Sequence, residues 1–234
     1  MIFLNTNCAF PYLKIKNLYS ERETYLIWKE IEFLSINNKL EPPQKTGQSD
    51  PNAKKNSGIF IDDVYTERKF SDILQINRKI FSKEITEKYK NLSFFGNYFL
   101  NINLDYTLLQ YYENDEFYKS HMDQSVITTI TWFFKEPKKF IGGDLLFPNY
   151  NELVKIENNL TVIFPSCIHH EVIPIKMEKR FTNMGLGRYS LSNFAHIKPY
   201  LHMKHYQMLT SPNNKKYLFF YHSFQLKLLF LYWH

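Results

Sequence analysis

Hydrophobic residues recur at helical spacing in the first part of the chain. Segment 20–40 carries an apolar stripe that predicts a helix, formed by Tyr25, Leu26, Trp28, Ile31, Phe33 and Leu34. Ser20 with Glu23 three positions later matches a capping box, which marks the start of that helix. Before it, PYLKIKNLYS alternates apolar and polar residues and predicts a strand. A second stripe predicts a helix over about 66–89, with a core face of Phe70, Ile73, Leu74, Ile80, Phe81 and Ile85.

After Gly96 the hydrophobic pattern changes to period two and short apolar runs. These runs predict about eight strands: NYFLNINL, YTLLQYY, ITTITWFF, DLLFPNY, LVKIE, LTVIFP, HEVIPI and RFTNMGLGRYSL. Many short strands separated by turn residues are typical of a β-sandwich or barrel. The expected fold class is therefore α+β, with N-terminal helices that brace one face of a jelly-roll core.

Two segments do not fit this regular pattern. Residues 41–58 are polar and rich in Pro, Asn and Lys, so we expect a long lid or binding loop there. Residues 198–234 have few acids and no clear period, and we treat them as a C-terminal extension of unknown role. The apolar end of that extension is interrupted by polar residues and is shorter than the ~20 residues of a membrane helix, so no membrane span is expected.

Composition adds only broad limits. The chain has 234 residues, of which 44% are hydrophobic and 18% aromatic, enough to build a sizeable core. Its net charge of +6 is spread along the chain, so nucleic acid is not an expected partner. Cys8 and Cys167 are far apart and form no CxxC pair, which fits a reducing, cytoplasmic setting without disulfides.

The first candidate for chemistry is the His-x-Asp pair in YYENDEFYKSHMDQSVITTITWFF. On an extended backbone residues i and i+2 point to one face, so His121 and Asp123 aim at a common point. An imidazole nitrogen and a carboxylate oxygen at one point can be two ligands of a divalent metal. Short motifs of this kind also arise by chance, and a surface pair is the competing interpretation.

A third ligand is available in FPSCIHHEVIPI, which contains both His169 and His170. Strand alternation puts these two on opposite faces, so only one of them can join His121. Two His, one carboxylate and open positions make the facial triad of non-haem Fe(II) oxygenases. The alternative is one His hydrogen-bonded in the core and the other at the surface.

Further along the chain, Arg180 in KRFTNMG is a candidate anion partner. Between strands of a barrel it would face the same cavity, where a buried Arg needs an anion such as a bound carboxylate. Thr182 lies two positions on, and its hydroxyl could donate a hydrogen bond to the same carboxylate. An ordinary exposed Arg180 is the competing interpretation, since most Arg side chains are exposed.

Together these segments resemble the Fe(II)- and 2-oxoglutarate-dependent dioxygenases of the prolyl 4-hydroxylase-like family, over about residues 95–195. The matching stretches are YYENDEFYKSHMD, the turn in IGGDLLF, FPSCIHHEVIPI and the basic residue that follows. The resemblance implies a double-stranded β-helix, a jelly-roll and cupin-like core. It implies one oxygenase domain over 1–197, with helical support over about 1–94 and the core over about 95–197.

The resemblance also implies roles for individual residues. His170, just before Glu171 and Val172, is the ligand that joins His121 and Asp123, and His169 faces outward. Tyr112 matches a position whose phenol helps to hold 2-oxoglutarate. Arg180, with Thr182 beside it, would pair with the distal carboxylate of that cosubstrate. Two departures are Trp132, where the family usually has Tyr, and the unusual run 183–187.

The activity implied is hydroxylation of an unactivated C–H bond with Fe(II), 2-oxoglutarate and O2, with ascorbate as a candidate accessory. The substrate is expected to be a prolyl residue in a protein or peptide, a free amino acid or another small molecule. Two rival classes stay open: a non-catalytic jelly-roll binding module, and a cupin-type metalloenzyme that does not use 2-oxoglutarate.

Overall fold

The computed structural model describes residues 1–4, 10–48 and 50–198. In this part of the chain the α-helices are α1 (Glu21–Ile36), α2 (Ile61–Val64), α3 (Asp72–Ile76), α4 (Lys83–Leu92) and α5 (Gly96–Phe99). Short 3-10 turns are η1 (Pro43–Lys45), η2 (Arg68–Phe70), η3 (Asn77–Phe81), η4 (Pro148–Tyr150) and η5 (Lys179–Phe181). Helices combined with antiparallel sheets confirm the predicted α+β class.

Two antiparallel sheets contain nearly all the strands of these residues. The seven-stranded sheet has the order β1 (Ile2–Leu4), β2 (Leu13–Lys16), β11 (Leu160–Pro165), β7 (Ile127–Phe133), β14 (Arg188–His196), β5 (Leu104–Tyr112) and β4 (Ser57–Phe60). The five-stranded sheet has the order β10 (Glu152–Val154), β9 (Leu145–Phe147), β12 (His170–Val172), β6 (Phe117–His121) and β3 (Lys54–Lys55). A separate pair joins β13 (Lys176–Met177) to β8 (Phe140–Ile141).

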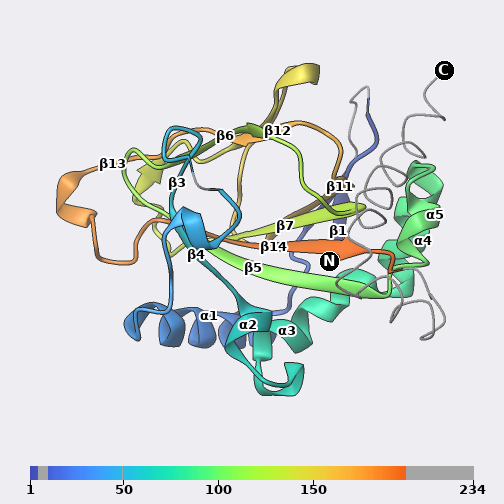
Figure 1. Ribbon diagram of the computed structural model, residues 1–234, viewed down its shortest axis with the longest axis horizontal. Coiled ribbons are helices and arrows are strands. Elements are labelled where there is room, and N and C mark those ends of the chain that lie inside the picture. The colour runs from blue at the N-terminus through green and yellow to red at the C-terminus, as the bar shows by residue number, and fades with distance from the viewer. Residues whose placement is uncertain (5–9, 49, 199–234) are drawn as a thin grey trace, which may run out of the picture. The chain divides into compact units, whose positions relative to one another are not determined.

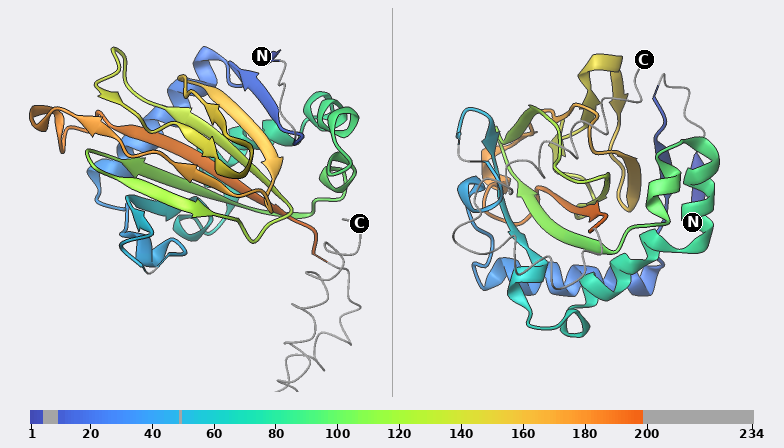
Figure 2. Two further views of the ribbon diagram at one scale, coloured as in Figure 1. Left: turned by 90° about the horizontal axis from the view of Figure 1, so that it is seen from above. Right: turned by 45° about the vertical axis from the view of Figure 1, so that its right-hand side comes forward.

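The seven-stranded sheet separates two hydrophobic cores. Helices α1 to α3 run along its outer face, and β6 and β12 lie on the opposite side (Figure 1, Figure 2). Alternation along β14 shows the division: Tyr189 and Leu191 join the core under the helices. Arg188, Ser190 and Ser192 point to the other side, toward the five-stranded sheet. The strand therefore has a polar face that looks between the sheets.

The predicted start of the first helix is confirmed. Ser20 Oγ accepts a hydrogen bond from the backbone N–H of Glu23, whose carboxylate accepts one from the N–H of Ser20. The predicted apolar face is only partly right, because Tyr25 and Phe33 are exposed and Ile27 is buried with Ile31 and Leu34. Residues two positions apart on a helix do not share a face, so Phe33 cannot lie inward with Ile31.

The prediction of one helix over about 66–89 is wrong. The chain forms α3 and α4 instead, interrupted at Ser71 and Ser82, whose backbones are extended. Ser71 Oγ accepts from the N–H of Leu74 and donates to the buried carboxylate of Glu30, which also accepts from the N–H of Ile73. A side chain of α1 thus stabilises the start of α3, which no local pattern could indicate.

Two strand predictions and the loop prediction are also corrected. NYFLNINL contains α5 and β5 begins only at Leu104. The expected loop 41–58 contains η1, β3 and the start of β4. The last strand begins at Arg188 and not at Arg180, because Asn183 (φ 61°) and Gly185 (φ 65°) take left-handed conformations that no strand accommodates.

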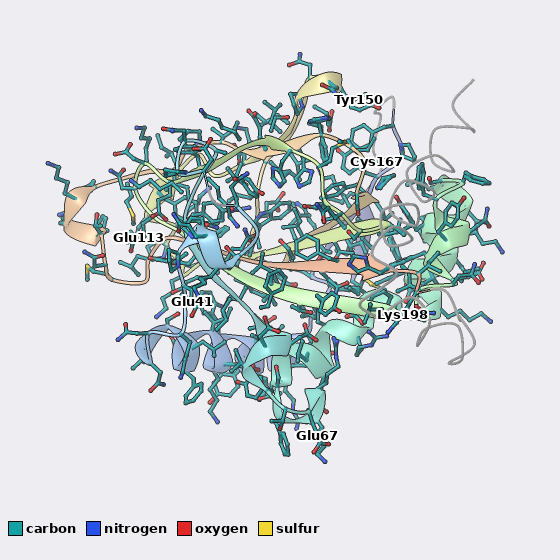
Figure 3. The ribbon with its side chains drawn as sticks, viewed as in Figure 1. Glu41, Glu67, Glu113, Tyr150, Cys167 and Lys198 are labelled. Carbon is teal, nitrogen blue, oxygen red and sulfur yellow. The ribbon has the colours of Figure 1, made fainter. Side chains whose placement is uncertain are left out.

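Some predictions concern residues outside the described ranges. The extension 198–234 lies there except for Lys198, and so does Cys8. Cys167, on the connection from β11 to β12, is exposed and free (Figure 3). Within the described ranges, none of the helices has the length and apolar character needed to cross a bilayer.

Candidate metal centre and ligand cavity

The end of β6 and the start of β12 bring the predicted metal ligands together. His170 pairs directly with His121 across the antiparallel ladder. The backbone N–H of Asp123 donates to the carbonyl oxygen of Ser166 at 3.0 Å, which holds the segment after β6 beside the end of β11. One ligand atom from each of His121, Asp123 and His170 lies within 4.8 Å of the others. The three side chains converge as the sequence predicted.

Hydrogen bonds fix the orientation of both imidazoles. His121 Nδ1 lies 2.8 Å from the carbonyl oxygen of Lys119, and His170 Nδ1 lies 3.0 Å from that of Ile168. A carbonyl can only accept, so each Nδ1 carries its hydrogen and donates it. In the neutral ring each Nε2 then carries a free lone pair. The Nε2 atoms of His121 and His170 lie 3.8 Å and 3.5 Å from the carboxylate oxygens of Asp123. This is the arrangement in which His ligates a metal.

The Asp123 carboxylate is oriented by its own partner. Thr128 Oγ1, on β7, donates to Asp123 Oδ2 at 2.6 Å. Thr128 Oγ1 also lies 2.9 Å from Ser166 Oγ, so the seven-stranded sheet contributes to the placement of a ligand from the other sheet. Oδ1 is left available for a metal.

Electrostatics favour the neutral imidazole at His121. Burial, and then the neighbouring His170, lower the pKa of His121 to about 3. A neutral ring is the form that coordinates a metal, so no proton has to leave before binding near neutral pH. Phe164 packs edge-on against His170, with ring centroids 4.9 Å apart, and Tyr118 stacks on His121 at 3.5 Å. These rings restrict water around the two ligands.

His169 lies directly before β12 and not on the strand itself. Its Nδ1 lies 3.3 Å from Ser120 Oγ, and it is not in the converging trio. His170, in contrast, is 3% exposed. Of the two candidates left open by the sequence, the structure therefore brings His170 to His121.

The trio opens into a cavity of about 320 Å³ between the two sheets. Its floor consists of the inward residues of β14 and β5, and its upper wall consists of residues of β3, β6 and β12. The polar or charged lining residues are Thr46, Lys54, Tyr106, Gln110, Tyr112, Tyr118, His121, Asp123, Gln124, Ser125, His170, Arg188, Ser190, Ser192 and His196. Asp123 is the one carboxylate among these lining residues.

Arg188 is the most distinctive residue of the cavity. It is 1% exposed, and its Nε and Nη1 have no hydrogen-bond partner. The guanidinium lies over the rings of Tyr112, at 4.7 Å, and Trp132, at 5.8 Å. Burial lowers its pKa to about 10, which leaves it charged near neutral pH. A buried cation with free donors in a cavity is a preformed site for an anion.

The structure corrects the expected position of Arg180 and Thr182. Arg180 lies on η5, its side chain is 71% exposed, and its Nε pairs with Glu178 at 2.8 Å. Thr182 ends the same turn, and neither residue lines the cavity. The chain makes an additional turn before β14, so the first inward position of that strand falls to Arg188. Alternation in RYSLSNFAH, which begins at Arg188, was the sequence signal that pointed to it.

Tyr112 lies in the cavity, as the resemblance led us to expect. It is buried, and its Oη accepts a hydrogen bond from Gln110 Nε2 at 3.2 Å. Burial raises its pKa well above the usual range, so the phenol keeps its proton. Trp132, which stands where the family usually has Tyr, lies fully buried beside Arg188.

Comparisons with known proteins agree with this picture at the level of fold. No protein-family model matches the sequence, and no curated protein matches it significantly. Among solved structures, the chain is similar to a prolyl 4-hydroxylase from Pseudomonas putida, with a TM-score of 0.56 and 16% identity over 80% of this chain and 94% of that one. It is also similar to an oxidoreductase of the 2-oxoglutarate/Fe(II) oxygenase family from Burkholderia pseudomallei, with a TM-score of 0.52 and 13% identity over 80% and 86%. The resemblance to prolyl 4-hydroxylase-like oxygenases is therefore confirmed for the fold.

Proposed function

We propose that the protein is a Fe(II)- and 2-oxoglutarate-dependent dioxygenase that hydroxylates an unactivated C–H bond. One observation carries the proposal: His121, Asp123 and His170 converge in the same cavity that holds the buried, unpaired guanidinium of Arg188. In this proposal residues 1–197 form one oxygenase domain. Its two sheets are the two halves of a double-stranded β-helix.

The three converging residues fit Fe(II). Two imidazole Nε2 lone pairs and one carboxylate oxygen are the facial donor set of non-haem iron oxygenases. Hydrogen bonds to Lys119, Ile168 and Thr128 already orient them. When bound, Fe(II) with 2-oxoglutarate and O2 supplies the oxidation of the C–H bond, with succinate and CO2 as co-products.

We assign to Arg188 the cosubstrate role that the sequence suggested for Arg180. A free donor of its guanidinium, Nε or Nη1, can form a charge-assisted hydrogen bond with the distal carboxylate of 2-oxoglutarate. Ser190, two positions on, lies on the same face with a buried hydroxyl that has no partner, and it takes the place expected for Thr182. In this proposal the protonated phenol of Tyr112, which lines the same cavity, also contacts 2-oxoglutarate.

Two rival classes are less well supported. A non-catalytic binding module gives no reason for a complete donor trio whose ring nitrogens are oriented by hydrogen bonds. A cupin-type enzyme without 2-oxoglutarate gives no reason for a buried, unpaired Arg188, because an unsatisfied buried cation destabilises the fold. The class of substrate is open in this proposal between a prolyl residue and a small molecule.

The test is the cosubstrate reaction. Purified protein with Fe(II), ascorbate, O2 and 2-oxoglutarate is expected to form succinate, and candidate peptides or free amino acids that gain one oxygen atom by mass spectrometry are substrates. A protein that neither forms succinate nor binds 2-oxoglutarate anaerobically in the presence of Fe(II) is not an enzyme of this class.

A further inference from the structure

Lys54 places a second buried cation in the cavity, on the side opposite Arg188. It belongs to β3, the edge strand of the five-stranded sheet, and pairs in register with Tyr118 of β6. The residue is 1% exposed and lines the cavity together with Thr46 and Gly47. Lys is almost never fully buried without a partner, so its position needs an explanation.

The contacts of Lys54 are incomplete for a buried ammonium group. Its Nζ donates to the carbonyl oxygen and to Oγ1 of Thr46, both at 3.0 Å, and lies 4.9 Å from the centre of the Tyr118 ring. An ammonium group has three donors, so one is left without a protein acceptor. The ion pairs that Asp123 makes within the described residues are with His121 and His170, and not with Lys54.

Burial lowers the pKa of Lys54 to about 8, and the nearby charge of Asp123 acts in the opposite direction. The ammonium form therefore predominates near neutral pH, although none of the residues that the structure describes places a carboxylate at ion-pair distance to balance it. Either a ligand supplies the balancing negative charge, or the fold bears the cost of a buried, unbalanced ammonium group in order to hold Thr46 in place.

The balance of charge favours a ligand, and this step rests on the proposed function. Asp123 is the one carboxylate among the lining residues, and Arg188 and Lys54 are the Arg and Lys side chains among them. The charges of a metal dication, Asp123, the 2-oxoglutarate dianion and Arg188 sum to zero. The ammonium of Lys54 then remains as one positive charge without an opposite charge, in the same cavity as His121.

We propose that Lys54 binds a carboxylate of the primary substrate, and that this substrate is a small free carboxylic acid. Tyr118 links Lys54 to the candidate metal centre. Lys54 Nζ lies 4.9 Å from the centre of the Tyr118 ring, and the ring of His121 stacks on the ring of Tyr118. The cavity, at about 320 Å³, is at the lower end of the range of about 300–1,000 Å³ for small-molecule sites. An internal prolyl residue of a polypeptide has no carboxylate to offer.

The experiment measures binding and not turnover. Small free carboxylic acids, among them hydroxy acids, amino acids and simple aliphatic and aromatic acids, are each titrated calorimetrically, beside their amides, into the anaerobic protein loaded with Fe(II) and 2-oxoglutarate. At least one acid is expected to bind about tenfold or more tightly than its amide, because a charged partner strengthens the hydrogen bond. Lys54→Met is expected to abolish that preference, Lys54→Arg to keep most of it, and Lys55→Met, on the exposed neighbour, to leave it unchanged.

A second variant separates anchoring from a structural role. Thr46→Val removes one hydrogen-bond partner of Lys54 and keeps its charge, so the preference for acid over amide should persist. The proposal is overturned if no acid binds, if acids and amides bind alike, or if a blocked prolyl peptide is the only ligand. It is also overturned if Lys54→Met weakens the binding of 2-oxoglutarate itself, since Lys54 would then hold the cosubstrate. A parent protein that does not bind 2-oxoglutarate instead contradicts the proposed function.

Discussion

On the helix-covered face of the seven-stranded sheet, the buried carboxylate of Asp105 accepts hydrogen bonds from Arg68, Arg78 and Asn193. On the cavity face of the same sheet, Arg188 and Ser190 are just as buried, yet their Nε, Nη1 and Oγ atoms have no partner. The two faces come from the same strands, β5 and β14, at alternate positions.

This difference separates polar groups that hold the fold from polar groups kept for a ligand. A buried polar group normally finds a partner within the protein, because leaving it unpaired costs about 1–3 kcal/mol. Asp105 follows that rule by joining β5 to η2 and η3. Arg188 departs from it only where the cavity leaves room for an anion. Arg188 and Ser190 are therefore unpaired buried groups of this sheet that a ligand in the cavity could satisfy.

The largest expected effect concerns the metal. His170→Ala removes one of three donors and should weaken Fe(II) binding by more than the ~10–100-fold typical of a lost supporting hydrogen bond. His169→Ala, the adjacent control, should bind iron like the parent because His169 is not in the converging trio. Iron retained after desalting is the measurement. Loss of iron in His169→Ala with retention in His170→Ala would reverse the assignment.

Next in size is the effect on 2-oxoglutarate. Arg188→Ala removes one partner of a buried charged pair, which costs on the order of 2–5 kcal/mol, so affinity should fall roughly 30-fold to several thousand-fold. Arg180→Ala, on an exposed residue, should not change it. The anaerobic Fe(II) protein is titrated with 2-oxoglutarate, and the charge-transfer absorption band reports binding. Equal affinities in Arg188→Ala and the parent would contradict the cosubstrate site.

On the helix-covered face the expected effect is on stability. Asp105→Asn weakens three hydrogen bonds and should lower the free energy of unfolding by about 1–3 kcal/mol. The loss is smaller than the ~3–5 kcal/mol of a fully buried pair, because Arg68 and Arg78 keep access to water. Urea unfolding measures it, with Asp115→Asn in an exposed pair as the control. Unchanged 2-oxoglutarate affinity is part of the expectation, and a selective loss of that affinity would contradict the division between the faces.

The smallest effect compares two serines on the cavity face of β14. Ser190→Ala removes a hydroxyl without a protein partner, so stability should change by less than about 0.5 kcal/mol. Affinity for 2-oxoglutarate should fall about 2–12-fold, as for one hydrogen bond. Ser192→Ala should instead cost about 1 kcal/mol of stability, because Ser192 Oγ donates to Gln110 Oε1. Identical behaviour of the two variants in unfolding and titration would remove the distinction.

Much of the candidate site could be predicted from the sequence. His121 and Asp123 lie two apart next to a strand end, and spacing of two on an extended chain is enough to aim both at one point. The choice of His170 over His169 needed the family resemblance, since alternation alone left both open. Lys54 was not predicted, because it lies in a polar segment that carried no motif, and only the pairing of β3 with β6 brings it to the cavity.

The sequence by itself determined the local features: the capping box at Ser20, the period-two runs of β7 and β11, and the α+β class. These depend on neighbours along the chain, for which short-range periodicity is a sufficient guide. Tertiary structure alone decided that Glu30 stabilises the start of α3, and that the additional turn before β14 moves Arg180 to the surface and Arg188 into the cavity. In a strand, a shift of register by one residue reverses every side chain, and register is set by the partner strands and turns and not by the strand itself.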